Sequence, residues 1–261
     1  MIFDLINSYT PTNCETNFSI EKYTKLWIEG TMSNYDYLVA LNSAANRTRN
    51  DLSQYPVFPW VISNYESSTL DMGEFSNFRD LTKPIGALNK KRLEQFKQRY
   101  KEMPEPKFLY GSHYSNPGYV IGYLVRKYPH YMIKLHGGKF DHPDRLFNSI
   151  AIDWNICMNN PLSLKELTPE FYEENTEFLL NLLNLDLGHN SKNEKIGNVK
   201  LPAWANDAMD FLRKMREALE SQYVSANLHN WIDLIFGYKQ RGQPSIDADN
   251  GIKYIYKYIL N

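Results

Sequence analysis

The sequence predicts a mostly α-helical fold, a single domain with irregular extended segments in its core and little regular β-structure. Three observations lead to this prediction. Capped stretches with apolar residues at helical spacing recur along the chain, and one strongly apolar run is broken by prolines. Strand alternation is weak outside residues 252–258, where two lysines indicate an exposed edge or a frayed tail. At 261 residues, with 43% hydrophobic and 14% aromatic content, the chain has ample material for one core.

The proline-broken run covers residues 50–60 and reads Asn-Asp-Leu-Ser-Gln-Tyr-Pro-Val-Phe-Pro-Trp. Pro56 and Pro59 each remove a backbone donor and bias the preceding residue toward extended geometry, so neither a helix nor a central strand fits. The large apolar side chains of this ribbon are expected to be buried, namely Leu52, Tyr55, Val57, Phe58 and Trp60. Because a buried ribbon has no hydrogen-bonded ladder of its own, its N–H and C=O groups must bond to side chains from elsewhere.

Helices are expected on both sides of this ribbon. Ser19 is placed to cap a first helix, which Gly30 ends, and Ser33 precedes a second. Asn89 is placed to cap a third helix, with its charged side chains in solvent. Those side chains are Lys90, Lys91, Arg92, Glu94, Lys97 and Arg99.

Proline at the first helical position marks three further starts, because no backbone donor is needed there. The helix after His142 is expected to continue through Trp154, and the helix after Asn116 to stop before Pro129. Asn206 or Asp207 begins the next helix, and Gly237 ends the last one. The three proline starts are Asn116–Pro117, His142–Pro143 and Thr168–Pro169.

Charge and cysteine content limit the classes of function. The chain has 29 Lys and Arg against 30 Asp and Glu, a formal charge of -1, which argues against a nucleic-acid binder. Cys14 and Cys157 lie far apart, so neither a disulfide framework nor a zinc site is indicated, and a reducing, cytosolic compartment is expected. The start lacks a charged leader region, and no apolar run is long enough to span a bilayer. Any membrane association is therefore expected to be peripheral.

Residues 135–147, Leu-His-Gly-Gly-Lys-Phe-Asp-His-Pro-Asp-Arg-Leu-Phe, form the block most suggestive of chemistry. A phosphate-binding loop is disfavoured because Ile133 and Phe140 stand where that pattern needs Gly and Ser or Thr. The structural interpretation is favoured: Asp141 and Asp144 lie at a helix N-terminus, where free N–H groups and the dipole stabilise carboxylates. The two glycines then supply the turn.

Two other classes of function remain as alternatives. A hydrolase would need Asp141, His142 and His113 to converge in an accessible cleft. No zinc-protease histidine pair and no nucleophile elbow supports it. A peripheral lipid-binding domain would use a basic helix face toward anionic headgroups. That face comprises Lys90, Lys91, Arg92, Lys97 and Arg99.

Taken together, several ordered segments closely resemble the BEACH domain, the module shared by the lysosomal trafficking regulator, neurobeachin and the factor associated with neutral sphingomyelinase. The resemblance covers about residues 23–245. Asn46 departs from it, standing where the family usually has glycine, as does His136, where the family usually has glutamine. The segments are Trp27 with Ser-Asn-Tyr-Asp-Tyr-Leu at 33–38, the ribbon at 50–60, Phe-Arg-Asp-Leu-Thr-Lys-Pro-Ile-Gly-Ala-Leu-Asn at 78–89, Tyr-Gly-Ser-His-Tyr-Ser at 110–115, the block at 137–147, Leu-Pro-Ala-Trp-Ala at 201–205, and His-Asn-Trp-Ile-Asp-Leu-Ile-Phe-Gly-Tyr-Lys-Gln-Arg-Gly at 229–242.

The resemblance implies a helix-rich fold around extended core segments, and a role in vesicle traffic and in the size of lysosome-related organelles. No enzymatic activity is established for such modules. It also implies partners in the same polypeptide, a PH-like domain upstream and a WD-repeat propeller downstream, with a groove near the PH-like junction as the ligand site. Residues 1–22 are expected to be an extension or linker, 23–245 the BEACH domain, and 246–261 a divergent C-terminal tail.

We therefore expect a non-catalytic scaffold, cytoplasmic and peripheral to intracellular membranes, that acts through protein–protein interaction and needs no cofactor, metal or nucleic acid. A structural polar network is expected to hold the irregular segments by charge-assisted hydrogen bonds. Its members are Asn50, Asp51, Arg79, Asp80, His113, Lys139, Asp141 and Arg145. Partner binding is expected at Tyr55, Trp60, Tyr114, His142 and Asp144.

Overall fold

The computed structural model describes residues 19–252. In this part of the chain the regular structure is helical, and extended segments pair only through isolated β-bridges, so the predicted fold class is confirmed. The α-helices are α2 (Ile20–Ile28), α3 (Asn34–Ala44), α4 (Ile85–Leu88), α5 (Lys90–Glu102), α6 (Pro117–Tyr123), α7 (Pro129–Leu135), α8 (Ile150–Asn159), α9 (Ala208–Leu219), α10 (Gln222–Ile235) and α11 (Gly242–Asp247). The short 3₁₀ turns are η1 (Leu52–Gln54), η2 (Phe75–Asn77), η3 (Pro143–Arg145), η4 (Pro169–Tyr172) and η5 (Tyr238–Gln240).

The expected helix starts are confirmed where a side chain supplies the cap. Ser19, Ser33, Asn89, Asn116 and Asp207 are the N-caps of α2, α3, α5, α6 and α9. Each side chain accepts a hydrogen bond from the backbone N–H three residues later, which satisfies one of the free donors of the first turn.

The helix expected from His142 through Trp154 was wrong. η3 ends at Arg145, and the next helix, α8, begins only at Ile150. Between them the backbone turns to pair with a distant segment: the Ile150 N–H donates to the Lys200 carbonyl at 3.1 Å. The Ser149 hydroxyl then caps α8. This tertiary pairing interrupts a stretch whose apolar spacing alone suits one helix.

Two other prolines also differ from expectation. Pro129, expected only to follow the end of a helix, begins α7 instead. Thr168–Pro169 opens a single turn, η4, that ends at Tyr172. Proline fixes φ at the first helical position, but tertiary contacts set how far each helix continues.

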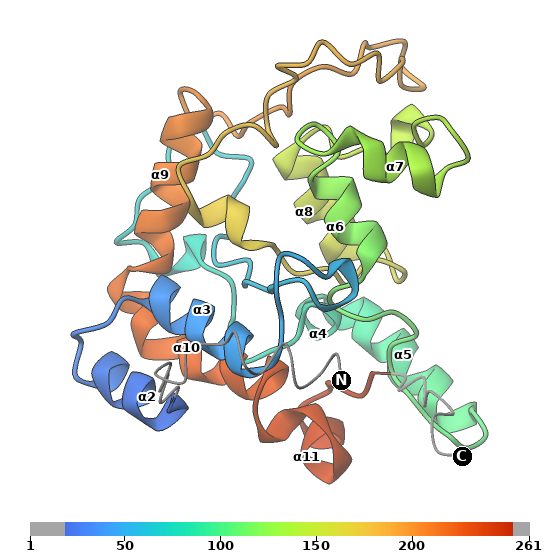
Figure 1. The fold of residues 1–261 in the computed structure, drawn as a ribbon. Coiled ribbons are helices and arrows are strands. Elements are labelled where there is room, and N and C mark those ends of the chain that lie inside the picture. Colours follow the sequence, from blue (N-terminus) through green and yellow to red (C-terminus); the bar gives the residue numbers. More distant parts are fainter. Residues whose placement is uncertain (1–18, 253–261) are drawn as a thin grey trace, which may run out of the picture.

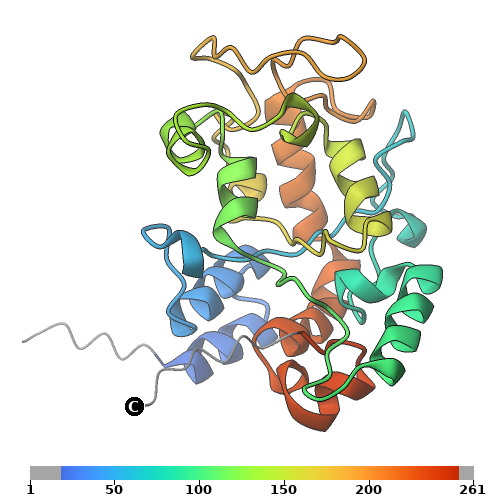
Figure 2. The same cartoon turned by 90° about the vertical axis from the view of Figure 1, so that its right-hand side faces the viewer.

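Figures 1 and 2 show the helices arranged around irregular chain. α6, α7 and α8 group at one end of the molecule, and α2 and α3 lie beside α10 at the other, with α5 at a corner. α9 and α10 follow one another along one side. No helix within residues 19–252 combines the length and apolar composition needed to cross a bilayer.

Residues 55–60 of the ribbon pass through this interior, as predicted, whereas residues 50–54 lie at its edge. Phe58 and Trp60 are completely buried, and Tyr55 and Val57 are almost so. Leu52 is only half-buried, because it lies in the turn η1 at the edge. The Trp60 ring lies among other aromatic rings at centroid distances of 5.3 to 6.1 Å, which are those of Tyr65, Trp154 and Phe171.

The segment between α3 and the ribbon needs one left-handed residue. Asn46, which replaces the glycine of the resembled pattern, has a φ of 56°. Asparagine tolerates this region better than other residues with a side chain, so the departure from glycine keeps the turn.

The ends of the chain lie mostly outside the described residues. Of the expected extension at residues 1–22, residues 20–22 belong to α2, and of the expected tail at 246–261, Ile246 and Asp247 belong to α11. The strand or frayed tail expected at 252–258 also lies outside them, apart from Ile252, which bridges to Tyr110.

Candidate functional site

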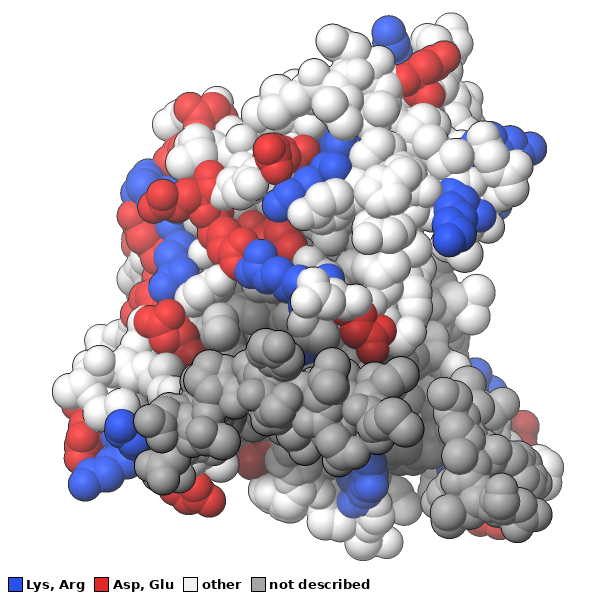
Figure 3. All heavy atoms as spheres, viewed as in Figure 1, with Lys and Arg blue, Asp and Glu red and all other residues white. Residues whose placement is uncertain are grey.

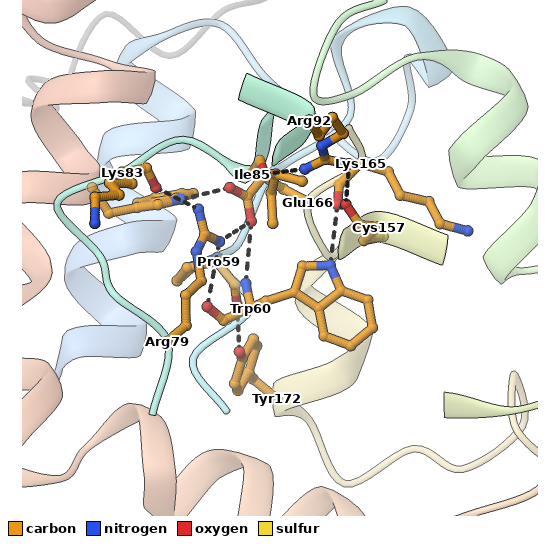
Figure 4. A network of polar contacts seen from close by, with 11 residues as sticks. Pro59, Trp60, Arg79, Lys83, Ile85, Arg92, Cys157, Lys165, Glu166 and Tyr172 are labelled. Carbon is orange, nitrogen blue, oxygen red and sulfur yellow. Dashed lines mark hydrogen bonds and ion pairs between the residues drawn. The ribbon is translucent and has the colours of Figure 1, made fainter. Parts of the chain in front are cut away.

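A buried carboxylate, Glu166, lies at the centre of the polar interior (Figure 4). One of its oxygens, Oε2, accepts hydrogen bonds from Arg79 Nη1 at 2.7 Å and from the Trp60 N–H at 3.2 Å. The other, Oε1, accepts from Trp231 Nε1 of α10 at 3.0 Å. Its own N–H donates to the Tyr114 carbonyl. Glu166 therefore joins the ribbon, the segment before α4 and α10 through one side chain.

Arg79 extends this network to more backbone. Its guanidinium donates to the Trp60 carbonyl at 3.4 Å and to the Lys83 carbonyl at 3.1 Å, besides its pair with Glu166. Both charged side chains are at most 2% exposed. A buried ion pair loses its hydration, so these additional hydrogen bonds are what make the arrangement favourable.

Phe58 pairs with the Leu167 backbone through an isolated bridge, and several other backbone groups of the ribbon are paired with side chains. Asn42 of α3 binds both polar groups of Val57, accepting from the N–H at 2.8 Å and donating to the carbonyl at 3.0 Å. Arg47 donates to the Tyr55 carbonyl at 3.0 Å, and the Tyr172 hydroxyl donates to the Pro59 carbonyl. The predicted interior, in which side chains satisfy unladdered backbone, is therefore observed.

Two further buried arginines bind carbonyl oxygens instead of carboxylates. Arg92, expected to be solvated on α5, is 3% exposed, and its guanidinium donates to the carbonyls of Cys157, Asn160 and Ile85. Arg126 donates to the carbonyls of Gly197 and Phe147 at 2.8 and 2.6 Å. Burial lowers the pKa of Arg126 to about 10 and also lowers the pKa of Arg92.

Arg92 corrects the basic helix face that lipid binding would use. Its side chain turns inward because the ends of α4 and α8 leave carbonyls without intrahelical partners. Arg99 lies against the Phe96 and Phe108 rings and donates to the Leu109 carbonyl, and Lys97 pairs with Asp249. Among the five residues of that face, Lys90 and Lys91 have no such contact within residues 19–252 and are exposed.

Of the predicted network residues, the structure places Arg79 in the buried network around Glu166. Asn50 and Asp51 are exposed beside η1, where the Asp51 carboxylate accepts from the Ser53 N–H. Asp80 is half-buried and pairs with Lys83 at 2.8 Å. Lys139 is exposed. The structure does not bring these four side chains into the buried network.

Asp141 and Arg145 pair with each other in a local cluster away from that network. Asp141 also lies 3.8 Å from His136 Nδ1. The side-chain hydrogen bond from Arg145 holds the pKa of Asp141 below its usual value. His142 Nδ1 accepts from the Asp144 N–H and so caps η3, and Asp144 accepts from the Ser191 N–H at 2.8 Å. His142 thus caps the short turn η3, while Asp141 bonds to the His142 N–H and to Arg145, and Asp144 bonds to the Ser191 N–H. The helix N-terminus at which the two carboxylates were expected is only this three-residue turn.

A cleft of about 670 Å³ holds the other predicted residues, His113 and Tyr114. The rings of these two residues lie 3.9 Å apart, and His113 Nδ1 is 3.0 Å from the Ser115 carbonyl. Burial, together with the positive charge of Arg47, lowers the pKa of His113 to about 4, so the imidazole is neutral at pH 7. Arg47 lies over the Tyr114 ring, and Arg241 lines the same cleft.

The residues proposed for hydrolysis occupy two different places. His113 lines the cleft, whereas Asp141 and His142 adjoin η3 and do not line it. The residues predicted to bind partners are also divided. Tyr55 and Trp60 are 3% and 0% exposed, because the ribbon packs their rings into the core. Tyr114 lines the cleft, and His142 and Asp144 lie at the surface.

Sequence reasoning missed Glu166 and Asn42, the side chains that bind the ribbon most directly. Each had a local signal. Asn42 lies four residues after Leu38 on the buried face of α3, and Glu166 lies between the buried Leu164 and Leu167. A polar residue in an apolar pattern is expected to have a specific partner, because burying it unpaired is costly.

Comparison with known proteins gives the family. The sequence matches the Beige/BEACH domain over residues 25–259. It is 48% identical over 235 residues to BEACH domain-containing protein B of Arabidopsis thaliana, covering 88% of this chain and 9% of that protein. It is 49% identical over 232 residues to BEACH domain-containing protein lvsD of Dictyostelium discoideum, covering 87% of this chain and 8% of that protein. It is 48% identical over 246 residues to Protein SPIRRIG of Arabidopsis thaliana, covering 91% of this chain and 7% of that protein.

The chain thus spans less than a tenth of the length of these relatives, while they match nearly all of it. The matched stretch contains the ribbon, Arg79 and Glu166, the features that give the interior its polar character. The chain belongs to the BEACH-domain family.

Proposed function

We propose that this BEACH domain is a non-catalytic scaffold in vesicle traffic, which binds a PH-like domain and further proteins at cytosolic membrane surfaces. The PH-like domain would precede it in the same polypeptide and a WD-repeat propeller would follow. The observation that carries the proposal is how the polar side chains are bonded. The buried ones bond to backbone, as Arg79 and Asn42 do, while the accessible cleft offers groups suited to binding.

The engagement of the candidate catalytic groups supports a non-catalytic role. His142 caps η3, Asp141 pairs with Arg145, and His113 is a neutral imidazole beside the Ser115 carbonyl. A general base must reach the proton that it removes and must lie beside its partner groups. Here His113 lies in the cleft whereas Asp141 and His142 lie beside η3, and each of the three side chains already has a structural contact.

The cleft is suited to an upstream neighbour for two reasons. First, Ile20 at the start of α2 lines it, so a domain linked through the preceding residues would be tethered near the cleft and present at high effective concentration. Second, the described residues that line the cleft include Arg47 and Arg241 and no carboxylate. Apolar side chains such as Leu41 and Phe236 complete the lining. A partner surface with acidic and apolar side chains fits this combination.

The test is a calorimetric titration of this chain with the purified PH-like neighbour from the same full-length protein. Arg241→Glu, in the cleft, should weaken binding about tenfold by placing like charges together. Lys91→Glu on α5 makes the same charge change on another surface and should leave the affinity unchanged. Absence of binding, or equal loss in both variants, would refute the assignment of the cleft.

Lipid binding is the second candidate, and sedimentation with anionic vesicles at increasing salt distinguishes it. The burial of Arg92 leaves the α5 face with few free cations, so we expect no salt-sensitive pelleting of the chain. Salt-sensitive pelleting that Lys90→Glu and Lys91→Glu together abolish would favour the lipid-binding role instead.

A further inference from the structure

A second hollow, separate from the cleft, lies between α9 and the chain that follows η4. It has a volume of about 830 Å³. We call it the α9 groove and define it by Tyr35, Tyr172, Glu174, Met209, Leu212 and Glu217. Tyr172 and Leu212 are buried, whereas Met209 is 48% exposed. An apolar side chain of a partner would therefore meet a partly exposed methionine, whose flexible thioether adapts to different shapes.

The charges that line the α9 groove are mostly negative. Five carboxylates line it, against two guanidinium groups, those of Arg213 and Arg216. Figure 3 shows acidic side chains gathered over the flank of the molecule that carries α9. The five carboxylates are those of Glu173, Glu174, Asp207, Asp210 and Glu217.

The two arginines are already engaged within the domain. Arg216 lies 4.0 Å from the centroid of the Tyr35 ring, donates to the Tyr172 carbonyl and pairs with Glu220. Arg213 pairs with Asp210 and Glu217 of its own helix. Among residues 19–252, no ion pair within 4.0 Å involves Glu174 or Asp207. Glu173 pairs with Arg49, and Asp210 also pairs with Lys214, so the unneutralised negative charge of the groove is that of Glu174 and Asp207.

We propose that the α9 groove binds a short basic segment of a partner protein, in which an apolar side chain stands next to arginine or lysine. The apolar side chain would pack on Met209 and Tyr35, and the cation would pair with Glu174 at the rim. Carboxylates favour arginine in particular, because its planar fork donates two parallel hydrogen bonds. Acidic peptides and anionic lipid headgroups would be repelled by the same charges.

This inference rests on the proposed scaffold role and names the chemistry of one partner. Among the described residues, those that line the cleft include two arginines and no carboxylate, whereas carboxylates outnumber arginines in the lining of the α9 groove. Surfaces of opposite sign on one domain select different partners, since like charges brought together disfavour the wrong one. The domain would thereby hold its upstream neighbour and a basic segment at separate places.

The probe is a fluorescein-labelled peptide of about ten residues with alternating arginine and leucine, titrated with the whole chain and followed by anisotropy. A peptide with glutamate in place of arginine serves as the opposite-charge control. We expect only the arginine peptide to bind, with an affinity that falls several-fold between low and high salt because the contacts are electrostatic.

Three variants locate the binding site, after melting curves show that each is folded. Glu174→Lys should weaken binding about fivefold to tenfold, and Met209→Ser should weaken it several-fold without changing the charge. The matched control is Glu94→Lys, an exposed residue of α5, which makes the same charge change elsewhere and should have no effect.

Several outcomes would overturn the inference. The first two are a lack of binding of the arginine peptide and tighter binding of the glutamate peptide. The third is a loss of affinity in Glu94→Lys as large as that in Glu174→Lys. The fourth is self-association of the chain that Glu174→Lys disrupts, which would assign the groove to a second copy. Failure here is separable from failure of the scaffold proposal, because binding of the upstream neighbour is measured on the cleft with Arg241→Glu. A normal neighbour titration with a failed peptide titration would refute the groove alone.

Discussion

Arg79 Nη1 and Glu166 Oε2 lie 2.7 Å apart in the interior, although the two residues are 87 positions apart in the sequence. Both also bind the backbone of Trp60: Arg79 donates to the Trp60 carbonyl, and Glu166 accepts from the Trp60 N–H. The pair thus satisfies the backbone of Trp60, two residues beyond the isolated bridge between Phe58 and Leu167. Its burial makes the domain dependent on both partners.

Arg79→Ala should destabilise the domain by about 3 to 5 kcal/mol, because Glu166 would remain as a buried charge without its partner. The free energy of unfolding, measured in urea, gives the effect. Arg145→Ala is the matched control: the arginine of its pair with Asp141 is 69% exposed, so its loss should change the free energy of unfolding far less than Arg79→Ala does. An unchanged melting temperature for Arg79→Ala would show that the buried pair does not stabilise the fold.

Asn42→Ala should cost roughly 1 to 3 kcal/mol, because it leaves the buried N–H and carbonyl of Val57 without partners. Urea unfolding measures this loss as well. Asn159→Ala, at the exposed end of α8, removes the same side chain from a solvated position and should change stability by less than about 0.5 kcal/mol. Equal effects of the two substitutions would contradict the role assigned to Asn42.

Gly86→Ala should destabilise the domain, because a Cβ at that position would lie 2.3 Å from Cε1 of the buried Tyr110 ring. We expect a loss of roughly 1 to 3 kcal/mol from overpacking. Gly122→Ala offers a helical glycine with nothing within 4 Å of the added atom, and should stabilise α6 by up to about 1 kcal/mol. Thermal melting of the two variants should therefore shift in opposite directions, and a shared direction would contradict the packing around Tyr110.

His113 should make stability depend on pH. Its pKa is lowered from 6.5 to about 4 in the folded state, mainly by burial, so between these two pH values the unfolded chain binds a proton that the folded chain does not. The free energy of unfolding is therefore unaffected by His113 above pH 6.5 and decreases as the pH falls from 6.5 toward 4. Unfolding measured across this window should be less pH-dependent in His113→Asn than in the wild type. Identical slopes would show that His113 titrates normally in the folded domain.

Local sequence patterns predicted a large part of the fold. Side-chain caps such as Ser33 and Asn89 mark helix starts because their hydrogen bonds reach only three residues along the chain. The irregular course of the ribbon follows from Pro56 and Pro59, and its burial from the size of residues such as Trp60. These features depend on neighbouring residues, so one sequence is enough to read them.

The partners of the ribbon could not be read in the same way. Glu166 and Asn42 reach Trp60 and Val57 only after the chain has folded, and Arg92 turns inward because distant helix ends supply carbonyls. Likewise, the helix expected after His142 breaks where its backbone meets a remote segment. Hydrogen bonds that close long loops carry no local periodicity, and many polar residues could form them. Tertiary packing therefore selects which side chains build the interior and which remain on the surface.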